Sequence, residues 1–180
     1  MRSLLALLLF SGPSFAQDWA ATCVCDYTSH SFPGRNCGLS EIVDKAPADL
    51  MVVFVKDNSL NKPNRWLALP RRPTSGKPQT LGDITPAERA ELFRQAIVRA
   101  RELWGERWGL AMNGIRSRGQ CQTHVHIGRL LDGVEWGDFK EISSPEEIPD
   151  PGDLGLWIHP VANGKMHVHV EMVTESVLAR

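Results

Sequence analysis

The strongest constraint on the fold is a helical segment in the middle of the chain, residues 85–104. Thr85 is suited to cap its N-terminus, Pro86 stands at the first helical position, and Glu88 completes a capping box. Gly105 follows as a C-terminal stop. Apolar residues recur at helical spacing along one face: Leu92, Phe93, Ala96, Ile97, Ala100, Leu103 and Trp104. The pattern predicts one amphipathic helix whose apolar stripe packs against a core.

Segments with strand character lie on both sides of this helix. Upstream, residues 50–56 form an apolar run rich in β-branched side chains, and residues 65–69 follow after a turn, which predicts an antiparallel pair. Downstream, residues 109–113 and a segment that runs to about Leu131 are the next expected strands. Residues 17–48 and 133–155 are expected to be irregular.

A C-terminal β-hairpin is expected between residues 156–162 and 165–174, because Asn163-Gly164 is typical of two-residue hairpin loops. Such a loop sets Pro160 opposite His167 and Ile158 opposite His169. His167 and His169 then share one face of the hairpin, and His159 points to the other. The order of elements predicts an α+β fold, an antiparallel sheet with one main helix and this hairpin.

The N-terminus reads as a secretory signal peptide, residues 1–16. A charged start is followed by a short apolar run, residues 4–10, and by small residues at Ser14 and Ala16. Cleavage is expected after Ala16; an uncleaved anchor is the alternative. The mature chain, residues 17–180, is expected to be one exported domain, periplasmic or secreted, that is soluble or only peripherally attached to a membrane.

The net charge of the chain bears on which binding partners are expected. The net charge of −1 does not indicate a general surface for nucleic acid or anionic membranes.

An even number of cysteines in an exported chain suggests disulfides. Cys37 is expected to pair with Cys23 or Cys25, and Cys121 either pairs with the remaining cysteine or keeps its thiol beside the histidines. A Cys/His metal site is the alternative, although no C-x-x-C pair is present.

Residues 113–128 carry the chemistry of the chain. In an extended strand side chains alternate, so Gln122, His124 and His126 point to one face, and the residues between them, which are mostly apolar, point to the core. The turn before this strand supplies Arg116, Arg118 and Gln120. Two imidazoles and an amide beside a basic turn are suited to hold a phosphate and to attack it.

This segment resembles the histidine triad superfamily of nucleotide hydrolases and transferases, above all its CDP-diacylglycerol pyrophosphatase branch. The resemblance rests on Leu110-Ala111-Met112-Asn113, on Arg118-Gly119-Gln120, and on Gln122-Thr123-His124-Val125-His126-Ile127. Upstream, Val53-Phe54-Val55-Lys56-Asp57, Trp66-Leu67-Ala68-Leu69-Pro70 and the long helix follow in the family's order. It covers roughly Cys37 to Leu131, and nothing in the last third matches.

One departure concerns the first histidine of the triad. An alignment without a gap from Asn113 puts Gln122 in the first slot, His124 in the middle and His126 last. A longer turn would instead make His124 first, His126 middle, and place Gly128 last. The first alignment is favoured, because the second puts Arg129 in an apolar slot.

The resemblance implies an HIT-like fold and a phosphoric anhydride hydrolase. The middle histidine of the family attacks the α-phosphorus of a nucleotide, and water breaks the nucleotidyl-histidine intermediate. The implied substrate is a nucleoside diphosphate diester, a small molecule or a lipid such as CDP-diacylglycerol, which yields a nucleoside monophosphate and a phosphorylated product. The family's chemistry needs no metal or other cofactor, and homodimers are common in the superfamily.

The residue types fit this chemistry. His124 is the expected nucleophile, and His126 the hydrogen-bond donor to phosphate or leaving group. The expected phosphate-binding set consists of neutral amides, which stabilise the equatorial oxygens, and of arginines, which neutralise a second phosphate: Asn113, Gln120, Gln122, Arg116 and Arg118.

A second pair, His167-x-His169, supports a rival hypothesis. Two His-x-His strands brought side by side would place four imidazoles around Zn or Cu. The alternative function is therefore an exported histidine-rich metal-binding protein or metalloenzyme.

Overall fold

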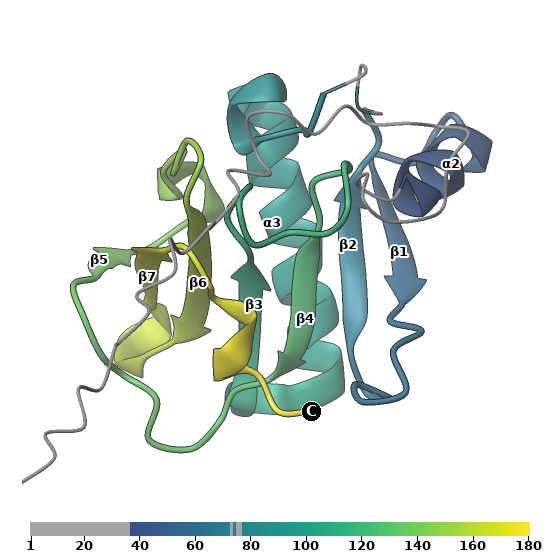
Figure 1. The fold of residues 1–180 in the computed structure, drawn as a ribbon. Helices are drawn as coiled ribbons and strands as arrows, with labels where there is room; N and C mark the ends of the chain where they lie inside the picture. Colours follow the sequence, from purple (N-terminus) through teal and green to yellow (C-terminus); the bar gives the residue numbers. More distant parts are fainter. Residues whose placement is uncertain (1–36, 73, 75–76) are drawn as a thin grey trace, which may run out of the picture.

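The computed structural model describes residues 37–72, 74 and 77–180, and these build a single antiparallel sheet with one main helix (Figure 1). The strand order is β1-β2-β4-β3-β6-β7-β5. The strands are β1 (Val52–Lys56), β2 (Trp66–Pro70), β3 (Trp108–Met112), β4 (Val125–Arg129), β5 (Lys140–Ile142), β6 (Gly155–Pro160) and β7 (Met166–Glu171). Short 3₁₀ turns lie at η1 (Leu81–Asp83), η2 (Gly105–Arg107), η3 (Pro145–Glu147), η4 (Ala162–Gly164) and η5 (Glu175–Val177). The predicted α+β class is confirmed.

The main helix, α3 (Pro86–Trp104), begins and ends where the sequence predicts. The Thr85 hydroxyl accepts a hydrogen bond from the Glu88 amide at 3.2 Å, and the Glu88 carboxylate accepts one from the Thr85 amide at 2.7 Å. Gly105 ends the helix with φ 55°, a value that favours glycine. The apolar stripe of α3 packs into the main core, behind the sheet in Figure 1, with the inward side chains of the strands.

A second helix, α2 (Gly38–Lys45), covers part of the opposite face. The expectation of irregular structure up to residue 48 is wrong here, because Leu39 and Val43 recur at helical spacing and bury against Val53, Leu67 and Leu69. Likewise β5 lies within the stretch 133–155 that was expected to be a loop. It is a three-residue edge strand, too short to show an alternating pattern.

The C-terminal segment, residues 174–180, lies over the same face as α2 (yellow in Figure 1). The Asn113 Oδ1 atom accepts hydrogen bonds from the amides of Thr174 and Glu175 at 3.0 and 3.2 Å. The buried Arg65 guanidinium donates to three carbonyl oxygens of this segment, those of Glu175, Leu178 and Ala179. These contacts fix the Glu175 side chain beside β4.

The C-terminal hairpin forms, but its predicted register is wrong by one residue. His159 lies opposite His167, and Trp157 lies opposite His169. The loop is η4 rather than a two-residue turn: the Val161 amide donates to the Lys165 carbonyl at 2.9 Å, and Asn163 takes φ 64°. A shift of one residue moves a strand's side chains to the opposite face. His159 therefore shares a face with His167 and His169, contrary to the prediction.

Several N-terminal predictions lie outside the described residues: the signal peptide with its cleavage site at Ala16, Cys23 and Cys25. Cys37 and Cys121 are both buried and pack together, and the disulfide pairing stays a prediction. No helix in residues 37–72, 74 or 77–180 combines the length and the apolarity that a membrane span requires.

Candidate functional site

A cavity of about 400 Å³ opens between α2, β1, β2 and the start of β4. That volume lies within the range of small-ligand sites, which is about 300–1,000 Å³. The cavity combines imidazole, amide and charged groups with an apolar wall. Its lining consists of Gly38, Leu39, Ile42, Val55, Lys56, Asp57, Asn58, Lys62, Leu67, Gln120, His124 and His126.

His124 lies immediately before β4 and is held in one orientation. Its Nδ1 atom lies 2.9 Å from the Gln122 carbonyl oxygen, which accepts only if Nδ1 carries the proton. The Nε2 atom of the neutral ring then keeps its lone pair. Burial lowers the pKa of His124 to about 4, and the nearby Arg118 guanidinium acts in the same direction. At neutral pH this side chain is therefore an uncharged base and nucleophile.

His126 lies on β4 next to His124, with 4.9 Å between the ring centroids. Its Nε2 atom lies 3.4 Å from a Glu175 carboxylate oxygen, and its Nδ1 atom 3.9 Å from Asp57. Burial holds the pKa of His126 well below its usual range, and repulsion from His124 adds to this. Sequence reasoning missed both acidic neighbours; Asp57 follows directly on β1, whereas Glu175 is brought in from the far end of the chain.

Of the amides predicted to bind phosphate, Gln120 lines the cavity and Gln122 does not. The Gln120 Oε1 atom is buried and has no hydrogen-bond partner among the described residues, so the amide is available to a ligand. The Gln122 amide is fully engaged in the interior. It donates to the Pro70, Arg72 and Gln79 oxygens at 3.3, 2.9 and 2.9 Å, and accepts from the Thr74 amide and the Ser40 hydroxyl.

Three other predicted phosphate ligands also lie outside the cavity lining. Arg118 is buried, and its guanidinium donates to the Gln120 and Gln79 carbonyls and to the Thr123 hydroxyl, so it shapes the turn. Asn113 holds the C-terminal segment. Arg116 is exposed on the turn. The predicted segment therefore supplies Gln120, His124 and His126 to the cavity lining, whereas Arg118 and Asn113 bind groups of the protein itself.

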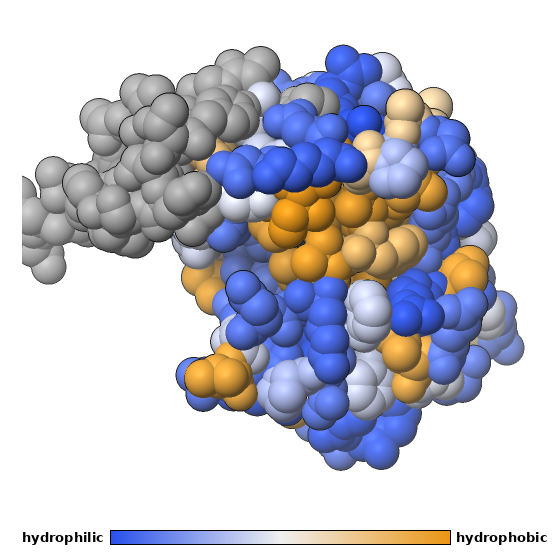
Figure 2. All heavy atoms as spheres, turned by 90° about the vertical axis from the view of Figure 1, so that its right-hand side faces the viewer, coloured by the Kyte–Doolittle hydropathy of each residue, from blue (hydrophilic) through white to orange (hydrophobic). Residues whose placement is uncertain are grey.

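The cations of the cavity come instead from the β1–β2 hairpin. Lys56 and Lys62 line it, and the Lys62 ammonium lies 2.7 Å from the Glu175 carboxylate. The apolar wall is formed by α2 and the two strands. Figure 2 faces the side of the molecule where α2 and β1 lie, and it shows hydrophobic residues gathered in the middle with hydrophilic ones around them.

A second group of histidines lies on the same face of the sheet, on β6 and β7. His159, His167 and His169 meet Glu135 there. The pairs His124/His126 and His167/His169 do not come together, because β3 and β6 lie between β4 and β7. Three inter-strand steps amount to about 14 Å, which is too far for one shared metal ion. The four-imidazole site of the rival hypothesis is therefore not formed.

Comparison with models of known protein families, and with curated proteins, finds no match for this chain.

Proposed function

We propose that the chain is an exported phosphohydrolase of the histidine triad type, similar to CDP-diacylglycerol pyrophosphatase. It cleaves a nucleoside diphosphate diester to a nucleoside monophosphate and a second phosphorylated product. The HIT-like character of the fold belongs to this proposal, since it rests on the order of elements between Cys37 and Leu131 and on the residues quoted above.

The observation that carries the proposal is the state of His124. Its proton is held on Nδ1 by the Gln122 carbonyl, its pKa is lowered to about 4, and the ring lines a cavity of ligand size. An oriented, uncharged imidazole is what nucleophilic attack on phosphorus requires near neutral pH.

The reaction then has two displacements. The His124 Nε2 lone pair forms a bond to the α-phosphorus, and the bond to the oxygen that bridges the two phosphates breaks with its electron pair. The second phosphorylated product leaves with that oxygen. A water molecule next attacks the phosphorus of the nucleotidyl-histidine, the electron pair of the P–N bond returns to His124 Nε2, and the water gives its proton to the solvent. Two lower barriers replace one high barrier.

Four features of the cavity suit such a substrate. Lys56 and Lys62 supply positive charge for the diphosphate, and the Gln120 Oε1 atom is placed to accept a hydrogen bond from a hydroxyl of the substrate. Leu39, Ile42, Val55 and Leu67 give an apolar wall. His126, held by Glu175, stands beside the nucleophile, where a proton on Nε2 donates a hydrogen bond to the leaving oxygen.

The test is a substrate panel of CDP-diacylglycerol, other nucleoside diphosphate esters and nucleoside phosphoramidates, assayed with and without EDTA. Release of a nucleoside monophosphate that resists EDTA is expected. The His124→Ala variant should lose that release and keep the far-ultraviolet circular dichroism spectrum, whereas His167→Gln, outside the cavity, should retain it.

The same variants decide which histidine forms the bond. Quenching in alkaline denaturant, which preserves the acid-labile P–N bond, during turnover of a substrate radiolabelled in its nucleotide should trap label on the wild-type chain and none on His124→Ala. Full activity in His124→Ala together with loss in His126→Ala would show that the other alignment of the triad holds. Activity in both variants would show that the mechanism is wrong.

A further inference from the structure

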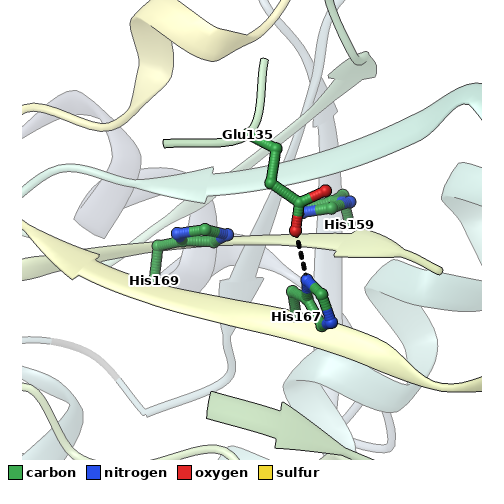
Figure 3. A group of neighbouring side chains, drawn as sticks. All are labelled: Glu135, His159, His167 and His169. Carbon is green, nitrogen blue, oxygen red and sulfur yellow. Dashed lines mark hydrogen bonds and ion pairs between the residues drawn. The ribbon is translucent and has the colours of Figure 1, made fainter. Parts of the chain in front are cut away.

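A second site lies on the C-terminal hairpin, away from the cavity of His124. His159 on β6 and His167 on β7 are directly opposite each other, and His169 follows two residues along β7. Glu135 enters from the loop before β5 (Figure 3). One ligand atom from each of the four side chains lies within 4.8 Å of all the others. Figure 3 shows the three imidazoles around the Glu135 carboxylate, and His167 Nδ1 is hydrogen-bonded to that carboxylate.

Three ring nitrogens of this group are buried without any hydrogen-bond partner among the described residues. They are Nε2 of His159 and both nitrogens of His169. A buried polar atom that lacks a partner destabilises the fold, so such atoms are uncommon unless a ligand satisfies them. The His159 Nδ1 atom lies 3.1 Å from the Pro160 carbonyl oxygen. Donation there leaves the Nε2 lone pair directed at Glu135, as in histidines that bind metals.

The donor types of this group also suit a metal ion. Three imidazoles and one carboxylate are the donor types that zinc prefers.

Aromatic rings hold two of the imidazoles in place. Trp157 stacks on His169 with centroids 3.7 Å apart and an interplanar angle of 7°, and Phe139 stacks on His167 at 3.8 Å and 12°. Ligand atoms of a tetrahedral zinc ion lie about 3.3 Å apart. The distances between the four ligand atoms must therefore shorten when the metal binds. Glu135 is able to move closer because it lies on a loop and its side chain is 48% exposed.

We propose that Glu135, His159, His167 and His169 form a binding site for one divalent transition-metal ion of the zinc class. The site differs from the four-imidazole arrangement considered above, since it contains His159 and Glu135 and excludes both histidines of the cavity. It is independent of the phosphohydrolase proposal.

The experiment uses the chain prepared without a histidine tag, stripped with EDTA, dialysed, and titrated with ZnCl₂ in a calorimeter. One equivalent of Zn²⁺ per chain is expected. The His167→Gln and Glu135→Gln variants should bind Zn²⁺ at least about 100-fold more weakly, since even groups behind the ligands change metal affinity by about 10- to 100-fold. Glu135 is exposed, so its variant tests the site without endangering the fold.

The matched control is the double variant His124→Gln/His126→Gln, which removes the other histidine pair and should bind Zn²⁺ like the wild type. Titration with Co²⁺ should produce intense visible absorption bands, which report four-coordinate geometry. Absence of saturable binding, or equal affinity in wild type, His167→Gln and Glu135→Gln, would overturn the proposal. Loss of binding in the double variant alone would show that the metal binds in the cavity of His124 and His126, and this result would also overturn the proposal. Metal binding is measured directly, so inactivity toward nucleotides has no bearing on the result.

Discussion

Acidification from pH 7.5 to 5 is expected to destabilise the fold through His124. The pKa of this residue is about 4 in the folded chain, against about 6.5 in an unfolded one. Between these values the unfolded state binds a proton that the folded state does not. The contribution of His124 to the free energy of unfolding is therefore fully present above pH 6.5. It falls as the pH drops and levels off once the pH is below 4.

The size of the effect follows from the two pKa values. At pH 5 protonation of His124 multiplies the statistical weight of the unfolded state by about 33 and that of the folded state by about 1.1. The unfolded state is therefore favoured by a ratio of about 30. This corresponds to a loss of about 2 kcal/mol from His124 alone. His126, whose pKa is also lowered by burial, adds a loss of the same sign.

The assay is urea unfolding at pH 7.5 and pH 5, for the wild type and for His124→Gln. For each protein the free energy of unfolding at pH 5 is subtracted from that at pH 7.5, and only these two differences are compared. A difference in stability between the two proteins at pH 7.5 therefore does not affect the result. The wild type should lose about 2 kcal/mol more than the variant on acidification. Equal losses in the two proteins would refute the reasoning, because His124 would then be protonated in the folded chain as readily as in the unfolded one.

Three further substitutions test the supporting structure by urea unfolding at pH 7.5. Gln122→Glu turns a buried donor that meets three oxygens into a carboxylate, and should lower the free energy of unfolding by about 3 kcal/mol or more; a smaller loss at higher pH would contradict this. Asn113→Ala removes the acceptor of one buried and one partly buried amide and should cost about 1–3 kcal/mol, whereas an unchanged midpoint would show that water replaces it. Gly155→Ala places a Cβ 2.2 Å from the Met112 carbonyl oxygen and should cost about 1–3 kcal/mol or more, while Gly119→Ala, with open space around the new Cβ, should be nearly neutral.

The local signals of the sequence account for much of the fold. The capping box of Thr85 and Glu88, the apolar stripe of α3 and the β1–β2 pair depend on neighbouring residues, and all are as predicted. The hairpin register failed because the Asn163-Gly164 signal was read as a two-residue loop. Alignment of the apolar faces would have corrected it, since Ile158 pairs with Val168 and both are buried in the core.

The candidate site was less predictable, because it depends on contacts between distant segments. His124 and His126 both line the cavity, but Lys62 joins them from another part of the chain, and Glu175 reaches His126 from the C-terminal segment. Gln122 and Arg118 were expected at the phosphate, yet burial turns their polar groups toward interior carbonyls. A sequence pattern shows which residues are polar in an apolar setting, and only the packing shows which way each one faces.

The C-terminal segment lies between the two histidine groups, on the face of the sheet that α2 partly covers. Glu175 touches His126 on one side, while Val177 and Leu178 join Trp157, the ring that stacks on His169, in one apolar cluster on the other. The Arg65 guanidinium holds the segment by donating a hydrogen bond to the Leu178 carbonyl oxygen. Truncation before Thr174 would therefore remove the carboxylate beside His126 and, in the same step, the apolar side chains packed with Trp157, so one deletion would disturb the surroundings of both histidine groups.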